Sequence, residues 1–152
     1  MRRHRPRRSA AALAIALLLP VTGCVGDSTE EYCGAIKGSN KEIAEMIASD
    51  SPSALLSNLP LLRDLAEKSP EDLADEWQTF IGALDALDQA LDDAEVKPSD
   101  FKAGKPPGGL SAADQKAIAD AAGQVGGEQV VQATSGIEQQ ARDVCKVNLG
   151  LS

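Results

Sequence analysis

The fold is decided by residues 73–94, which read LADEWQTFIGALDALDQALDDA. Large apolar side chains recur there at alternating spacings of four and three, which is an a/d seam held over three heptads. The seam consists of Leu73, Trp77, Phe80, Leu84, Leu87, Leu91 and Ala94. A helix with such a seam needs partners to cover it, so the stretch predicts the central helix of a helical bundle.

Two helices are expected before the central one. The first opens with a capping box at Ser28–Glu31 and should continue through residues 38–40, because the apolar period resumes after them. The second starts at Ser51-Pro52, with proline in the first helical position. Pro60 should kink or split this helix, since proline cannot donate a hydrogen bond to the carbonyl four residues back.

Two further helices are expected after a long loop at residues 96–110, which holds three prolines and three glycines. Ser111 caps a short, alanine-rich helix that ends at Gly126-Gly127. The last helix runs from about Glu128 to Cys145 and again carries apolar residues at spacings of four and three. Residues 146–152 are expected to form an extended tail.

The first 23 residues have the parts of an export signal. Residues 1–8 hold five arginines and no acid, and residues 10–19 are an unbroken apolar run. A permanent membrane span needs about 20 apolar residues, so this run is too short to be one. Residues 1–23 are therefore predicted to be a cleaved signal peptide. Arg7-Arg8 leaves a twin-arginine export route open beside the general one, which is favoured.

Residues 21–24 resemble the lipobox of bacterial lipoproteins. Val21 stands where leucine is usual, Thr22 occupies the tolerant position, and Gly23 is the small residue before the cut. The resemblance implies that a diacylglycerol is attached through a thioether to Cys24, and that signal peptidase II cuts between Gly23 and Cys24. A thiolate is the nucleophile that this lipid transfer requires. The alternative is ordinary secretion with Cys24 unmodified.

The charge of the processed chain excludes several partners. All 23 acidic residues and ten of the 15 lysines and arginines lie in residues 24–152, which gives a net charge of −13. Nucleic acid is excluded as a partner, because its phosphates require a basic face. Anionic lipid would also be repelled, so the two acyl chains must hold the protein at the membrane, at about 0.8 kcal/mol per buried methylene. Residues 24–27 would form a very short tether.

Three cysteines are present, at positions 24, 33 and 145. If Cys24 carries lipid, Cys33 and Cys145 are the one intramolecular pair left in an oxidising compartment. The alternative is two unpaired buried thiols. The spacing is not CxxC and no histidine accompanies it, so a zinc or redox site is not expected.

The pairing also limits the topology. Cys33 would lie in the first turn of the first helix and Cys145 in the last turn of the last one, and a disulfide needs their Cα atoms within about 7 Å. An up-down bundle meets this condition with an even number of passes. Five helices are predicted, so the helix at residues 112–125 would be a cross-piece. The expected fold is an all-α, up-down four-helix-type bundle over residues 28–145, with its disulfide-bonded end nearest the membrane.

Catalytic chemistry is not expected. The single histidine, His4, leaves with the signal peptide, and no nucleophile or phosphate-binding motif is present. Asp75 and Glu76 are neighbours in sequence, as are Asp92 and Asp93, but adjacent residues on a helix point to different faces. No enzyme activity and no cofactor are predicted.

One row of carboxylates is a candidate for a metal site. Asp85, Asp88 and Asp92 each follow a leucine of the seam by one residue and could bind Ca²⁺. No EF-hand spacing is present, and such a row is more often a solvated face. No metal is predicted.

The mature region is similar to small helical lipoproteins of actinobacteria. The similarity covers residues 31–33 (Glu-Tyr-Cys), 61–65, 75–77 and 141–145. It implies fold and compartment but no activity. We expect a membrane-anchored binding module for an envelope protein or a cationic ligand. The alternatives are a structural envelope protein and an enzyme that uses carboxylates alone.

The lipid attachment is tested by Cys24→Ala. The variant should leave the membrane fraction, or accumulate as a precursor longer by 23 residues, because no thiol remains to accept the diacylglycerol. Membrane fractionation followed by immunoblotting measures both outcomes. The double variant Cys33→Ser/Cys145→Ser is the control and should stay attached. Normal cutting and unchanged attachment of Cys24→Ala would contradict the assignment.

Overall fold

The computed structural model describes residues 25–49, 52–101 and 105–151. These residues form an all-α bundle and contain no β-strand. The predicted signal peptide at residues 1–23, Cys24 and part of the 96–110 loop lie outside this part of the chain. The elements are α1 (Val25–Gly38), α2 (Asn40–Ala48), α3 (Pro52–Ser57), α4 (Leu59–Glu67), η1 (Glu71–Leu73), α5 (Ala74–Asp93), η2 (Pro98–Asp100), α6 (Ala112–Val125) and α7 (Glu128–Asp143).

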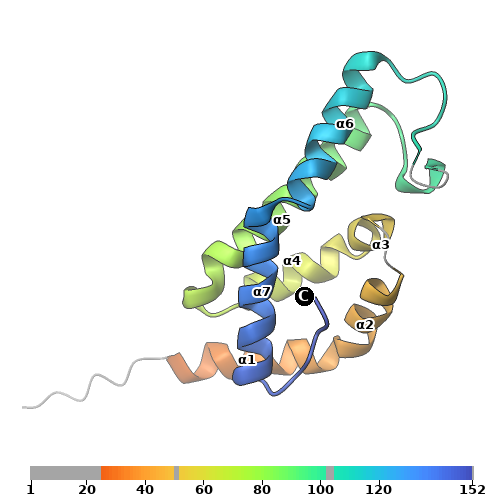
Figure 1. Cartoon of the computed structure of the whole chain (residues 1–152). Coiled ribbons are helices and arrows are strands. Elements are labelled where there is room, and N and C mark those ends of the chain that lie inside the picture. The colour runs from red at the N-terminus through yellow and green to blue at the C-terminus, as the bar shows by residue number, and fades with distance from the viewer. Residues whose placement is uncertain (1–24, 50–51, 102–104, 152) are drawn as a thin grey trace, which may run out of the picture.

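The central helix is confirmed. The 3-10 turn η1 leads into α5, whose apolar seam faces the core, and Leu84 is fully buried. α4 runs back along α5 from one side, while α6 and α7 return along it from the other (Figure 1). Burying one apolar seam against three helices therefore organises the whole bundle.

The first helix differs from the expectation at its start. α1 begins at Val25 instead of Ser28, so the predicted tether is helical up to the residue after Cys24. Cys33 consequently lies in the middle of α1 and not in its first turn. The capping-box residue types are also compatible with a helix interior, and residues 25–27 contain no proline that would stop the helix.

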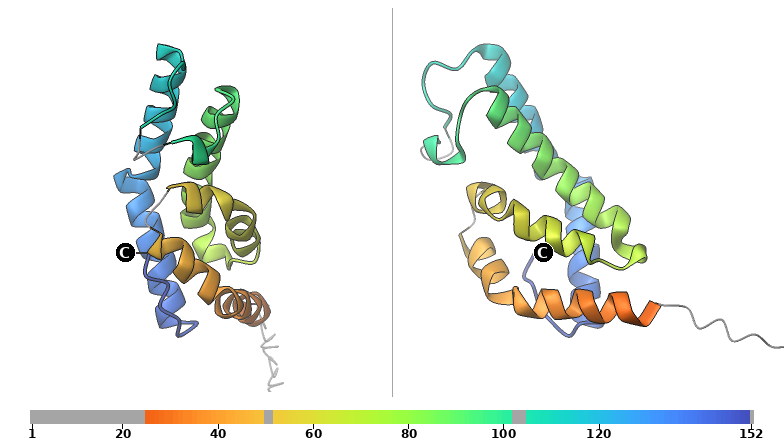
Figure 2. Two further views of the ribbon diagram at one scale, coloured as in Figure 1. Left: turned by 90° about the vertical axis from the view of Figure 1, so that its right-hand side faces the viewer. Right: turned by 180° about the vertical axis from the view of Figure 1, so that it is seen from behind.

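The expected continuity through residues 38–40 is wrong. Ser39 separates α1 from α2 with φ −97° and ψ 4°, and α2 leaves in a new direction (Figure 2). Helical hydrogen bonds still cross the break: Ser39 N donates to Ala35 O at 3.0 Å, and Ile43 N donates to Ser39 O at 2.9 Å. The apolar period resumes because the bonding continues, while the axis bends.

Pro60 splits the second predicted helix, as expected. α3 ends at Ser57, and Pro60 lies in the first turn of α4. Amides in the first turn of a helix have no carbonyl partner within the helix, so the missing N–H of proline costs no hydrogen bond there. Asn58 occupies the junction, and its Nδ2 donates to Ala54 O at 2.8 Å. The split lets α4 turn onto α5.

The cross-piece assigned to residues 112–125 is wrong. α6 packs along the C-terminal part of α5, with Ile118 and Ala121 buried, and α7 continues the same pass after Gly126-Gly127 (Figure 1). The reason is that the last leucines of α5 need cover, which α6 supplies. Four passes result, made by α1–α2, α3–α4, α5 and α6–α7. The predicted cap is confirmed, since Ser111 Oγ accepts a hydrogen bond from Asp114 N at 3.1 Å.

The chain after α7 is the extended tail that was predicted. Val147 N donates to Ala141 O at 3.0 Å, and Lys146 adopts φ 61°, so the chain reverses direction there. Leu149 is buried, and the returning tail packs on the core.

Candidate functional site

The Cys33–Cys145 disulfide is confirmed. Cys33 comes from the middle of α1 and Cys145 from the end of the α6–α7 pass, and their Cα atoms are 5.0 Å apart. Both residues are buried. α1 runs across the C-terminal end of α7, so the bond joins crossing elements rather than two parallel helix ends (Figure 1).

Tyr32, the residue before Cys33, connects α1 to the central helix α5. Trp77 Nε1 donates a hydrogen bond of 3.1 Å to Tyr32 Oη, and the two rings meet edge to face with centroids 6.4 Å apart. Tyr32 is fully buried. Burial raises the pKa of the Tyr32 phenol to about 12, although the bond from Trp77 acts in the opposite direction.

A depression of about 780 Å³ lies beside the first turns of α1. Ser28 and Thr29 of α1 line it, together with Gln140 of α7. Glu71 and Asp72 contribute carboxylates. Val144 also lines it and is 50% exposed, although the apolar period of the last helix predicted that it would be buried.

A second hollow follows α5 where the α6–α7 pass bends. It consists of two adjoining depressions of about 380 Å³ and 540 Å³, which share Thr79 and Gln129. Asp75 and Glu76 line the smaller depression and Glu128 lines the larger one. Gln132 Nε2 donates a hydrogen bond of 3.0 Å to Glu128 Oε1. We call the combined hollow the α5–α7 groove. Asp75 and Glu76 both line the smaller depression, and the expectation that they do not act as a catalytic acid–base pair stays a prediction.

The middle of the α5–α7 groove combines amide side chains with a floor of small residues. Small residues leave the space between the helices unfilled; they are Gly82, Ala83, Gly127 and Ala133. Amide groups offer both donors and acceptors of hydrogen bonds; the amides are those of Gln78, Gln124, Gln129 and Gln132. Within the described residues, no lysine or arginine lines either depression.

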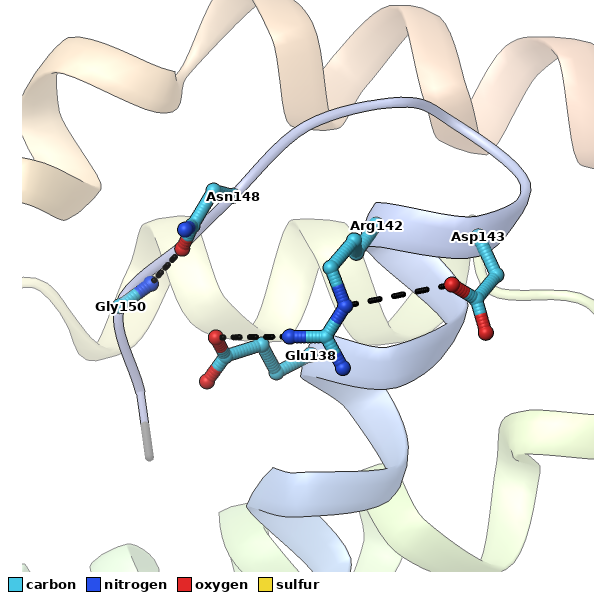
Figure 3. A network of polar contacts seen from close by, with 5 residues as sticks. All are labelled: Glu138, Arg142, Asp143, Asn148 and Gly150. Atoms are coloured by element: carbon cyan, nitrogen blue, oxygen red, sulfur yellow. Dashed lines mark hydrogen bonds and ion pairs between the residues drawn. The ribbon is translucent and has the colours of Figure 1, made fainter.

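Glu138 is a buried carboxylate that sequence reasoning missed. It lies on α7 and is only 4% exposed. Arg142 Nη1 lies 3.7 Å from its Oε1, and Arg142 Nε lies 3.9 Å from Asp143 Oδ1 (Figure 3). Nearby, the returning tail closes its own turn, where Gly150 N donates to Asn148 Oδ1 at 3.0 Å. The spacing of four between Glu138 and Arg142 is the signal that could have indicated this ion pair.

One residue of the carboxylate row Asp85, Asp88 and Asp92 forms a surface ion pair. Asp85 Oδ1 accepts a hydrogen bond of 2.7 Å from Arg63 of α4. In the part of the chain that the structure describes, no three acidic, histidine or cysteine side chains gather as a metal site would need.

Comparisons with known proteins find no matching family model, curated protein or solved structure. Val21, Thr22, Gly23 and Cys24, which are predicted to form a lipobox, lie outside the described residues. Among the helices at residues 25–143 that the structure describes, none is long and apolar enough to cross a membrane.

Tyr32 makes the stability of the domain sensitive to alkaline pH. Its folded pKa of about 12 lies above the ordinary value of 10.0. The stabilisation is therefore complete below about pH 10 and is lost as the pH rises towards 12, by roughly 2–3 kcal/mol. Tyr32 is the only tyrosine in the sequence, so the ultraviolet absorbance of phenolate follows this one group.

The control variant is Tyr32→Phe. It should remove this pH dependence, and should cost about 1–3 kcal/mol at neutral pH because the buried Trp77 N–H loses its acceptor. Urea unfolding at several pH values measures both effects. A folded wild-type protein whose phenol titrates near pH 10 would show that Tyr32 is not buried in this way.

Proposed function

We propose that this protein is a bacterial lipoprotein, held on the extracytoplasmic face of the cell membrane by a diacylglycerol on Cys24. We propose further that its acidic helical domain is a binding module for a cationic partner. The single observation that carries the proposal is Val21–Cys24 at the end of a short apolar leader. The remaining features support it from independent directions.

The disulfide supports the extracytoplasmic side of the proposal. Disulfides persist in oxidising compartments and are rare where thiols are kept reduced. Because Cys33 is bonded to Cys145, the third cysteine of the sequence has no partner within the chain. Cys24 is thus left for a reaction of its own, and it stands where the lipobox requires the acylated residue.

The start of α1 supports a domain held close to the bilayer. α1 begins at Val25, directly after the residue proposed to carry the lipid. A helix cannot extend as a flexible linker does, so the first turn of the domain would lie at the membrane surface. The depression lined by Ser28, Glu71 and Asp72 would then face the headgroup region.

Charge supports the class of partner. A domain of net charge −13 is repelled by anionic lipid headgroups. The same charge attracts basic ligands and speeds their encounter. The α5–α7 groove is a hollow lined by Asp75, Glu76 and Glu128, and a basic ligand could bind there.

The proposed function is tested by crosslinking in intact cells, followed by capture of the tagged protein in detergent. The wild type should retain one recurring partner with a basic surface, and high salt before crosslinking should reduce its yield. The matched control is Cys24→Ala behind a conventional cleavable signal peptide, which exports the same domain without lipid. It should lose a partner that resides at the membrane. Repeated trials without an enriched partner would contradict the proposal.

A further inference from the structure

We propose that the C-terminal tail, residues 146–151, is a strap that opens while the helical bundle stays folded. We propose also that the surface beneath it binds an extended partner segment with apolar side chains at every second position. We call this surface the tail seat; it is the part of the core that Val147, Leu149 and Leu151 cover. The proposal goes beyond the acidic binding module, because it uses neither the charge of the domain nor the lipid.

The root of the tail is fixed by contacts that do not involve the rest of the tail. Cys145 is bonded to Cys33 of α1. Directly after it, Lys146 adopts φ 61°, and Val147 N donates to Ala141 O of α7 at 3.0 Å. These contacts hold the end of α7 to α1, and they remain in place when the chain beyond Val147 moves.

Beyond Val147 the tail is held by side chains alone. Among the residues that the structure describes, residues 148–151 form no hydrogen bond to another element. Their one hydrogen bond is internal, from Gly150 N to Asn148 Oδ1 (Figure 3). A segment with few buried contacts opens at a lower free energy than the helices of the core. The tail can therefore leave its seat without breaking a helical hydrogen bond.

The side chains of the tail show which ligand its seat accepts. Exposure alternates along the tail with the period of two that an extended chain gives. Leu149 is 4% exposed, and Val147 and Leu151 pack against the core. The residues between them, Asn148 and Gly150, are exposed. The seat thus fits an extended segment whose every second side chain is apolar.

A seated tail closes the seat to such a segment. A competitor has to wait for the tail to open, so its apparent affinity is reduced by the fraction of molecules that are open. The tail is in this sense an autoinhibitory contact. Because Cys145 is bonded to Cys33, opening stops at the root and leaves α1 and α7 in place.

The opening is tested in the processed, detergent-solubilised full chain with Leu149→Asp, which places a charge among buried apolar side chains. The variant should keep the helical circular dichroism and the cooperative urea unfolding of the wild type. It should also gain binding of an apolar fluorescent dye. The matched control is Asn148→Asp, which adds the same charge at an exposed tail position and should behave as the wild type. Loss of the folded bundle in Leu149→Asp would overturn the proposal.

The binding is tested with the peptide acetyl-Lys-Val-Asn-Leu-Gly-Leu-amide, which has the sequence of the tail itself. In a nuclear magnetic resonance titration it should shift signals of Leu149→Asp saturably. Its affinity for that variant should exceed its affinity for the wild type and for Asn148→Asp by about tenfold or more, because their seats are filled. The same peptide with aspartate in place of its first leucine should not bind.

Three results of the titration would contradict the proposal: no saturable shift in Leu149→Asp, equal affinity of that variant and the wild type, or equal binding of the aspartate peptide. Neither the acidic groove nor Cys24 enters these measurements. Failure here would therefore leave the acidic binding module and the lipid attachment as they are proposed above.

Discussion

The disulfide between Cys33 and Cys145 is the constraint on which the rest of the structure depends. It joins residues 112 apart in sequence, and closing a loop of about this length stabilises a fold by about 4.7 kcal/mol in the chain-entropy model. The net stability of a small domain is about 5–15 kcal/mol, so one bond is comparable to a large part of the total. The bond also holds α1 across the end of α7. The neighbouring Tyr32 is hydrogen-bonded to Trp77 of α5.

The proposed anchor at Cys24 and the α5–α7 groove are related through the start of α1. α1 would begin at the membrane, and the depression lined by Glu71 and Asp72 lies beside its first turns. The α5–α7 groove starts about one turn further along the chain, at Asp75, and runs away from that end to the bend between α6 and α7. A partner in the groove would therefore be held at a short distance from the bilayer.

Much of the fold could be predicted from the sequence, because a heptad seam, a proline and a capping serine act over a few residues. The break at Pro60 follows from local chemistry. The bend at Ser39 could not be predicted from the sequence, because helical hydrogen bonds continue across it and the apolar period therefore resumes after it. Val144 fits the apolar period but is exposed, and Glu138 breaks the period but is buried, because burial near a helix end depends on where the tail returns. The α5–α7 groove is made of small and polar residues from three helices, and periodicity does not reveal such a surface.

The most direct test is peptide mapping by mass spectrometry, without reduction, of the protein purified from membranes. The account predicts one crosslinked pair of peptides, which contain Cys33 and Cys145, and an N-terminal peptide in which Cys24 carries a diacylglycerol. A disulfide that includes Cys24, or free thiols at Cys33 and Cys145, would contradict the account. Either result would show that Cys24 is not the residue reserved for the lipid, or that Cys33 and Cys145 do not form the disulfide that closes the bundle.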